Sequence, residues 1–224
     1  AALDGFTNYT GNITLTDTHN LAQLKSINNA TSGEITLNSY SVNLSGSSSD
    51  VSDALAGTFA SSYTGNVSLN TDHTLSQLKT ISNATSGQIT LNDYTIALSG
   101  SSADLATALG GSFASAYTGD VSTSDAHNLA QLKAINNATS GTITLNDASV
   151  LLSGSISDIK AALAGIFATN YTGNVVITDG NGTAITATDI TTIDGDTTGT
   201  ITVSKNINIT GSAAQITSAV AVID

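Results

Sequence analysis

The stretch Tyr63–Ala116 reads "YTGNVSLNTDHTLSQLKTISNATSGQITLNDYTIALSGSSADLATALGGSFASA", and it is one copy of a unit that recurs along the chain. Successive copies open at Tyr9, Tyr63, Tyr117 and Tyr171, so the step from one copy to the next is constant. A unit of this length holds two coils of roughly 22 and 32 residues, and neither coil buries a core by itself. We therefore expect one elongated domain over residues 1–224, with repeats 9–62, 63–116, 117–170 and a divergent 171–224.

The first half of the unit predicts a strand followed by a short helix. In 65–69 apolar and polar residues alternate, as in a half-buried strand, and in 73–81 leucine and isoleucine recur every third position, as on one helix face. Thr74 and Gln77 form a capping-box pattern at the start of this helix. Gly87, in "NATSG", is expected to end the helix.

The first helix of each of the first three copies is expected to contain a lysine. Lys25, Lys79 and Lys133 occupy one repeat position. We expect them near the C-terminal end of the helix, where the dipole is negative and favours a cation.

The second half of the unit predicts two more short strands and a second helix. The strands fall within 88–100, and Asn92-Asp93 between them marks a bend that fits either a hairpin or a solenoid corner. The helix follows a cap pair, Ser101 with Asp104, and stops at Gly110-Gly111.

These helices span about two to three turns, too few to be stable in isolation, so their apolar faces must pack on another layer. A fixed alternation of strand and helix is best satisfied by a parallel β-solenoid with short helices on one side and about two coils per 54-residue repeat. A plain parallel β-helix, in which the helical segments are only corners, is the alternative.

The fourth copy differs from the others. It keeps a strand near 199–203 and a helix near 211–220, but it lacks the histidine, the Gln-Leu-Lys helix and the "LND" bend. Asp224 falls near the repeat position of Phe59, and Ala1 falls near that of Leu55. The matching phase predicts either head-to-tail self-association, which does not close, or a segment of a longer array.

Composition excludes several classes of function. The formal net charge is −12, and the only fixed cations are five dispersed lysines, so we expect no nucleic-acid partner. The acidity also disfavours an anionic membrane surface, and no apolar run is long enough for membrane insertion. The chain has no cysteine, which removes disulfides and thiolate sites. A 40% hydrophobic content predicts a folded chain.

The segments "LAQLKxINNATSGxITLND" and "LSGSxxDLxAALAGxFAxxYTGN" cover nearly the whole chain. They resemble tandem repeats of very large secreted or cell-surface bacterial proteins, cyanobacterial ones in particular. The resemblance implies an extracellular or cell-surface location and a role as adhesin, surface-layer or matrix component. The "GGxGxDxxx" nonapeptide that binds calcium in β-roll proteins is missing, so we do not expect calcium binding by that mechanism.

The histidines occupy one repeat position, at His19, His73 and His127, each shortly after an aspartate. In a solenoid with two coils per repeat they would lie about 10 Å apart, too far to share one metal ion. We expect each histidine to pack or hydrogen-bond locally at a helix entry. A series of separate His–Asp metal sites is the alternative.

Aspartates of the fourth copy are the candidate calcium ligands. They lie in two glycine-containing stretches that the sequence assigns to loops, and they are Asp179, Asp189, Asp194 and Asp196. Carboxylates on such loops suit calcium, whereas Asp and Gly are also ordinary turn residues. We expect no required cofactor, with calcium as the possible one.

Aromatic residues recur in pairs such as Phe59 with Tyr63 and Phe113 with Tyr117. Their regular spacing fits either a sugar-stacking ladder or, as we expect, packing between coils.

Almost every polar group recurs with the period, so no unique constellation of acid, base and nucleophile exists and we expect no enzyme. The leading hypothesis is an extracellular structural protein whose repeats stack into a rod and assemble with copies of themselves into a filament, sheath or surface array. The alternative is an adhesion module that contacts glycan, cells or ice.

Overall fold

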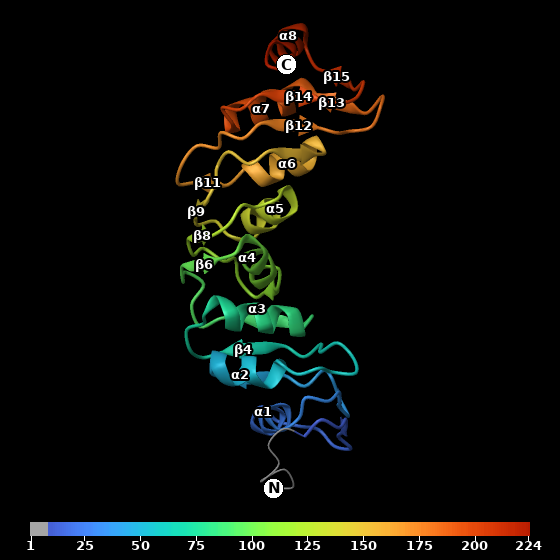
Figure 1. The fold of residues 1–224 in the computed structure, drawn as a ribbon, viewed down its shortest axis with the longest axis vertical. Coiled ribbons are helices and arrows are strands. Elements are labelled where there is room, and N and C mark those ends of the chain that lie inside the picture. Colours follow the sequence, from blue (N-terminus) through green and yellow to red (C-terminus); the bar gives the residue numbers. More distant parts are fainter. Residues whose placement is uncertain (1–8) are drawn as a thin grey trace. The chain divides into compact units, whose positions relative to one another are not determined.

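The computed structural model describes residues 9–224, in which short strands alternate with short helices (Figure 1). The helices are α1 (Leu21–Ala30), α2 (Ser48–Leu55), α3 (Leu75–Ala84), α4 (Ser102–Leu109), α5 (Leu129–Ala138), α6 (Ile156–Leu163), α7 (Ala187–Asp196) and α8 (Ala213–Ala221). The strands are β1 (Ile13–Thr14), β2 (Ile35–Thr36), β3 (Leu44–Gly46), β4 (Val67–Leu69), β5 (Gln88–Thr90), β6 (Leu98–Gly100), β7 (Ser112–Phe113), β8 (Val121–Thr123), β9 (Thr142–Thr144), β10 (Leu152–Gly154), β11 (Ile166–Phe167), β12 (Val175–Ile177), β13 (Ala184–Thr186), β14 (Ile201–Val203) and β15 (Asn208–Thr210).

The described chain divides into two compact units. One comprises the described residues up to Leu98 together with Thr107–Thr118, and the other comprises Ser99–Ala106 together with Gly119–Asp224. A single domain over residues 1–224 stays a prediction. The expected repeat position of Ala1 lies outside the described residues.

In the first unit, strands β3, β4, β5 and β7 form a parallel sheet. Leu44 pairs with Val67, and Val67 pairs in turn with Ile89. Ile89 then pairs with Phe113. Successive partners are therefore nearly equally spaced along the chain, unlike the coils of about 22 and 32 residues that the repeat length suggested.

In the second unit, strands β6, β8, β9 and β11 form one parallel sheet, and β10, β12 and β14 form another. Strands β5 and β6, on either side of the Asn92-Asp93 bend, belong to different sheets, so the bend is a corner and not a hairpin. The extra residues of the fourth copy lengthen the connection from Val175 to its partner Ile201, and strand β13, within this connection, pairs with β15.

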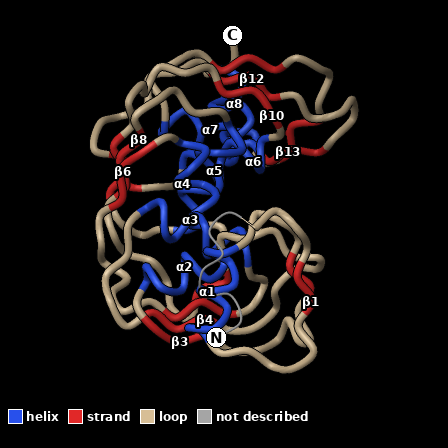
Figure 2. Tube along the Cα trace, turned by 60° about the horizontal axis from the view of Figure 1, so that its bottom comes forward, coloured by secondary structure: helices blue, strands red, loops and turns tan. Residues whose placement is uncertain are grey.

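The helices of each unit pack side by side (Figure 2). In the first unit α2 contacts both α1 and α3, and in the second unit α6 contacts both α5 and α7. Their apolar faces are buried, with Leu24, Val51 and Leu78 fully inaccessible to solvent. Tertiary packing therefore stabilises helices that are too short to persist alone. None of the described helices is long and apolar enough to cross a membrane.

The long helices end differently from the prediction. Helix α3 ends at Ala84, and Thr85 follows in an extended conformation. The Thr85 hydroxyl donates to the carbonyl of Gly65 at 2.8 Å and accepts from the Gly87 N–H at 2.9 Å. The same contacts recur at Thr31, Thr139 and Thr197. A threonine that also fastens the preceding coil ends each of these helices, so the prediction that glycine does so is wrong.

Gly87 is needed for close approach of the backbone. A Cβ atom there would lie 2.3 Å from the carbonyl oxygen of Gly65, and the same conflict recurs between Gly33 and Gly11 and between Gly199 and Gly173. Only glycine allows successive coils to come this close.

The fourth copy contains a helix where the sequence suggested that one was missing. Helix α7 has no Gln-Leu-Lys motif, but Ile190 and Ile193 are fully buried on its inner face. The predicted strand near 199–203 and helix near 211–220 are confirmed as β14 and α8. The alternation of parallel strands and helices in repeated units is thus confirmed, as a solenoid requires.

Candidate functional site

Each histidine contacts a tyrosine of the following repeat. His19 Nε2 lies 3.2 Å from Tyr63 Oη, and His73 Nε2 lies 3.3 Å from Tyr117 Oη. In the second unit His127 Nε2 lies 3.1 Å from Tyr171 Oη. The histidine and tyrosine side chains are buried. In each pair the histidine and the tyrosine are 44 residues apart in the sequence. We call these three pairs the clasps.

Each clasp also includes a backbone carbonyl from the coil between its two partners. Tyr63 Oη donates to the Val42 carbonyl at 2.6 Å, and Tyr171 Oη donates to the Val150 carbonyl at 2.6 Å. Tyr117 makes the matching bond to Ile96. One tyrosine hydroxyl therefore joins three successive coils. The expectation that the histidines contact only their local surroundings is wrong.

The hydrogen-bond directions fix the histidine tautomer. Because the tyrosine O–H donates to a carbonyl, the tyrosine oxygen must accept from the histidine Nε2–H, and Nδ1 then carries no proton. Nδ1 of His19, His73 and His127 is buried without a hydrogen-bond partner among the described residues. Each buried acceptor without a partner costs about 1–3 kcal/mol. The clasp holds both of its side chains away from solvent and leaves no open position at Nε2 for a substrate.

Burial lowers the pKa of all three histidines, because it disfavours the charged imidazolium. Burial likewise raises the pKa of Tyr63 to about 12. The negative charges of Asp72 and Asp93 partly oppose the lowering of the His73 pKa, and Asp147 and Asp125 do the same at His127. The clasps are therefore neutral pairs at neutral pH.

The aspartates in the bends that follow β5 and β9 have a structural role of their own. Asp93 Oδ1 accepts from both the backbone N–H and the hydroxyl of Thr95, and these bonds lower the pKa of Asp93. Asp147 and Ser149 repeat this turn. In the first copy Ser39 occupies the position, so the His19 clasp has no carboxylate there.

Acidification is expected to weaken the fold through the clasps. Unfolded histidine binds a proton near pH 6.5, whereas the folded clasps bind it only at a lower pH, so the unfolded state holds more protons between these values. The stabilisation is complete above about pH 6.5 and is lost as the pH falls through the lowered pKa of the folded histidines.

Urea unfolding measured at several pH values between about pH 8 and pH 5 tests this expectation. The urea concentration at the midpoint should be constant at the upper end of this range and should decrease once the pH is below about 6.5. The three histidine signals in NMR should also titrate at a pH below that of a free histidine peptide. Midpoints that stay constant over this range, with histidine signals titrating as in the peptide, would contradict the clasp geometry.

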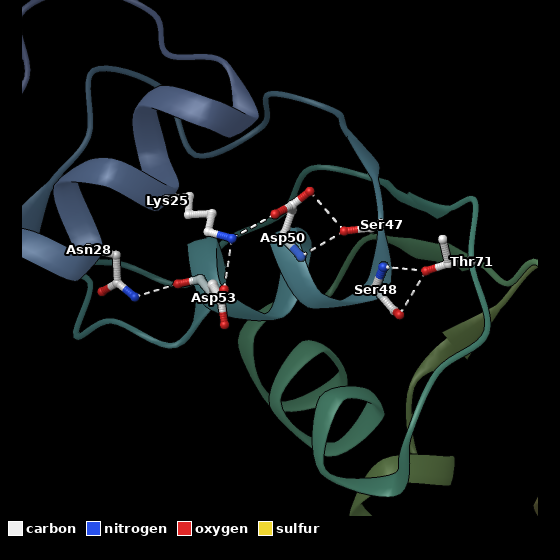
Figure 3. Close-up of polar contacts among 7 residues, drawn as sticks. All are labelled: Lys25, Asn28, Ser47, Ser48, Asp50, Asp53 and Thr71. Atoms are coloured by element: carbon white, nitrogen blue, oxygen red, sulfur yellow. Dashed lines mark hydrogen bonds and ion pairs between the residues drawn. The ribbon is translucent and has the colours of Figure 1, made fainter.

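Lysine–aspartate pairs link neighbouring helices (Figure 3). Lys25 Nζ, on α1, lies 2.6 Å from Asp50 Oδ1 and 2.9 Å from Asp53 Oδ2, both on α2. Hydrogen bonds with these carboxylates raise the pKa of Lys25, and its own hydrogen bond lowers the pKa of Asp50. In the second unit Lys133 pairs with Asp158 and Lys160 pairs with Asp189. The pairs are partly exposed, so their contribution to stability is modest.

Lys25 lies in the middle of α1, and neither α1 nor α5 has a basic residue in its last turn. The prediction that these lysines complement the helix dipole is therefore wrong. Their position lets them reach the next helix. Nearby, the Asn28 side chain donates to the backbone carbonyl of Asp53 at 2.5 Å, which adds a second link between α1 and α2.

The calcium candidates are not brought together. Asp179 Oδ2 accepts from the Ile156 N–H at the start of α6, and Asp189 pairs with Lys160. Asp189, Asp194 and Asp196 lie in helix α7, so the prediction that they stand on loops is wrong. Within residues 9–224 no three His, Asp or Glu side chains are grouped closely enough to hold a metal ion. Calcium binding by these aspartates stays a prediction.

The recurring tyrosines are internal. Tyr63, Tyr117 and Tyr171 are at most 1% exposed, so packing between coils is confirmed and a sugar ladder built on these rings is wrong. Each tyrosine also contacts the preceding phenylalanine, with ring centroids 6.3 Å apart for Phe59–Tyr63. The phenylalanine rings remain partly exposed.

A groove of about 1010 Å³ lies in the second unit beside α5. Its apolar part includes Leu129, Val150 and Leu151, and its polar part includes Lys133 and Asp158. Leu151 is 57% exposed, whereas the corresponding residue of the first copy is Asn43. The third copy is therefore more apolar here than the first.

No protein-family model, curated protein or solved structure matches the chain.

Proposed function

We propose that this chain is an extracellular structural protein whose repeats stack as a solenoid into a rod and assemble head to tail into a filament, sheath or surface array. One observation carries the proposal: the side chains that recur with the repeat bond from one coil to the next. The clasps, the Lys25–Asp50 type of ion pair and the Thr85 type of hydroxyl bridge all do so. A repeated unit whose polar groups are used for stacking suits a mechanical role.

Helix α8 supports the head-to-tail part of the proposal. Val220 on α8 corresponds to Leu163 on α6, counted from the serine that caps each helix. Leu163 is 2% exposed, whereas Val220 is 55% exposed. Ile216 is only partly buried, whereas its counterpart Ile159 is fully buried. A further coil of the same kind would cover this apolar face, and a second copy of the chain can supply one.

The extracellular location rests on the resemblance of the repeats to those of very large secreted and cell-surface bacterial proteins. The absence of cysteine from the sequence is compatible with that location but does not require it.

Electron microscopy of the purified protein tests the proposal. We expect unbranched fibres of uniform width that lengthen with protein concentration. Val220→Asp should abolish them, because a charge would have to be buried at each junction, while the exposed position leaves the single chain folded. Leu151→Asp is the matched control, since Leu151 is similarly exposed but lines the groove beside α5, to which α8 contributes no residue. Dispersed particles at every concentration, or fibres that Val220→Asp leaves unchanged, would refute this assembly.

Adhesion is the second candidate function, and the outward residues of the sheets support it. Ser45, Ser68 and Thr90 stand in register on β3, β4 and β5, and Ser122 and Thr144 do so in the second unit. Ser45, Ser68, Thr90 and Thr144 are exposed, and columns of hydroxyls at strand spacing can meet glycan, a cell surface or ice. Protein that stays dispersed but retards ice growth or retains a glycan column would favour this function over the filament.

A further inference from the structure

Beyond assembly, the first unit has a hollow of about 400 Å³ where the segment after α2 passes the end of α3. Phe59 lines it, next to the buried ring of Tyr63. Its rim includes the hydroxyls of Ser61, Ser62 and Thr80 and the amide of Asn83. The Phe59 ring is only partly buried, so one aromatic surface and several hydrogen-bonding groups border one open space.

The second unit has a hollow at the same place in its repeat. It measures about 200 Å³ and is lined by Phe167 and Tyr171, with Asn170, Asp196 and Thr198 among its polar groups. Phe167 and Tyr171 correspond to Phe59 and Tyr63, two repeats earlier. Two separate units thus form the same kind of hollow around the same aromatic pair.

The lining favours a sugar. A partly exposed phenylalanine ring packs well on the apolar C–H face of a pyranose, and nearby hydroxyls and amides can bond the sugar hydroxyls that point outward. No lysine or arginine lines either hollow. Helices α2 and α3 both end at the first hollow, and their C-terminal carbonyls carry partial negative charge. That charge repels acidic sugars and leaves neutral ones.

We propose that the hollows at Phe59 and Phe167 are two binding sites for neutral hexopyranose residues of a polysaccharide, one in each unit. In the first site Ala84 lies at the end of α3, and in the second Asp196 occupies the matching place at the end of α7. A carboxylate accepts hydrogen bonds from two adjacent sugar hydroxyls. The second site, although it is the smaller hollow, therefore gains an interaction with the sugar that Ala84 cannot provide in the first site.

Fluorine NMR tests the proposal on the full chain. The chain contains four phenylalanines, so 4-fluorophenylalanine labelling gives few signals, and Phe59→Leu and Phe167→Leu assign the two that matter. Cellohexaose, maltohexaose and laminarihexaose are the probes. We expect at least one of them to shift the Phe59 and Phe167 signals in a saturable way. No shift of either signal by any of the three at tens of millimolar would overturn the proposal.

Variants separate the two sites. In calorimetry with the binding oligosaccharide, Phe59→Leu and Phe167→Leu should each lose one site relative to the unaltered protein, and the double variant should lose both. Asn83→Ala keeps the aromatic ring and changes an exposed amide, so it should weaken the first site alone, by about tenfold at most. Leu151→Ala, outside both hollows, should bind as the unaltered protein does. A folded double variant that binds with the same number of sites and the same affinity as the unaltered protein would place the sugar elsewhere and reject both sites.

Discussion

Replacing Tyr63 with alanine is expected to lower the free energy of unfolding by about 3–5 kcal/mol, the range for removing a large buried aromatic side chain. Tyr63 is 0% exposed, and its loss leaves a cavity beside Phe59 and Val42. It also leaves the Nε2–H of His19 and the carbonyl of Val42 without their partner. Chemical denaturation monitored by circular dichroism measures the change.

Tyr63→Phe separates packing from hydrogen bonding. It keeps the ring and removes only the hydroxyl, so the cost should be that of the buried polar groups left unpaired, about 1–3 kcal/mol each. Tyr40→Phe is the control and should cost less, because the Tyr40 side chain is partly exposed and its hydroxyl accepts one hydrogen bond, from the Leu37 N–H. Equal stability of Tyr63→Phe and the unaltered protein would show that the clasp contributes nothing.

Replacing Gly87 with valine is expected to have the other large effect. A Cβ atom at Gly87 would lie 2.3 Å from the Gly65 carbonyl oxygen and 2.8 Å from that of Thr64. Both obstacles are backbone atoms of the preceding coil, so the coils must separate, and overpacking of this kind costs about 1–3 kcal/mol or more. The pairing of Tyr63 with Thr85 and the bonds of Thr85 would be strained at the same time.

Gly195→Ala is the matched control for Gly87. Gly195 lies within α7, and a Cβ atom there would meet nothing within 4 Å. Alanine should therefore stabilise the helix, by up to about 1 kcal/mol. The midpoint of thermal unfolding, measured for both variants, should be lower for Gly87→Val than for Gly195→Ala. Equal midpoints would mean that the coils do not approach each other as described.

The local features of the fold could be predicted from the sequence because their partners are near neighbours in the chain. Thr74 and Gln77 form the capping box that their spacing indicated, as do Asn20 with Gln23 and Asn128 with Gln131. The helix faces also follow from periodicity, since Leu78 and Ile81 are both fully buried. Helix α7 forms without the Gln-Leu-Lys motif because Ile190 and Ile193 maintain the same apolar face.

The contacts between coils could not be predicted in the same way. His19 and Tyr63 are 44 residues apart, and which coil faces which depends on the register of stacking, which spacing alone does not fix. The constant offset between each histidine and a later tyrosine holds for any two positions of the repeat, so it does not single out this pair. The position of Lys25 was misjudged for the same reason, because its partners Asp50 and Asp53 belong to the next helix.

The tautomer and contacts of the three histidines test most directly the claim that recurring clasps fasten successive coils. In protein labelled with ¹⁵N at histidine, at pH 8, we expect His19, His73 and His127 each to carry the proton on Nε2 and to show nuclear Overhauser contacts with the rings of Tyr63, Tyr117 and Tyr171. Averaged tautomers without these contacts would contradict the stacking register and the structural role built on it.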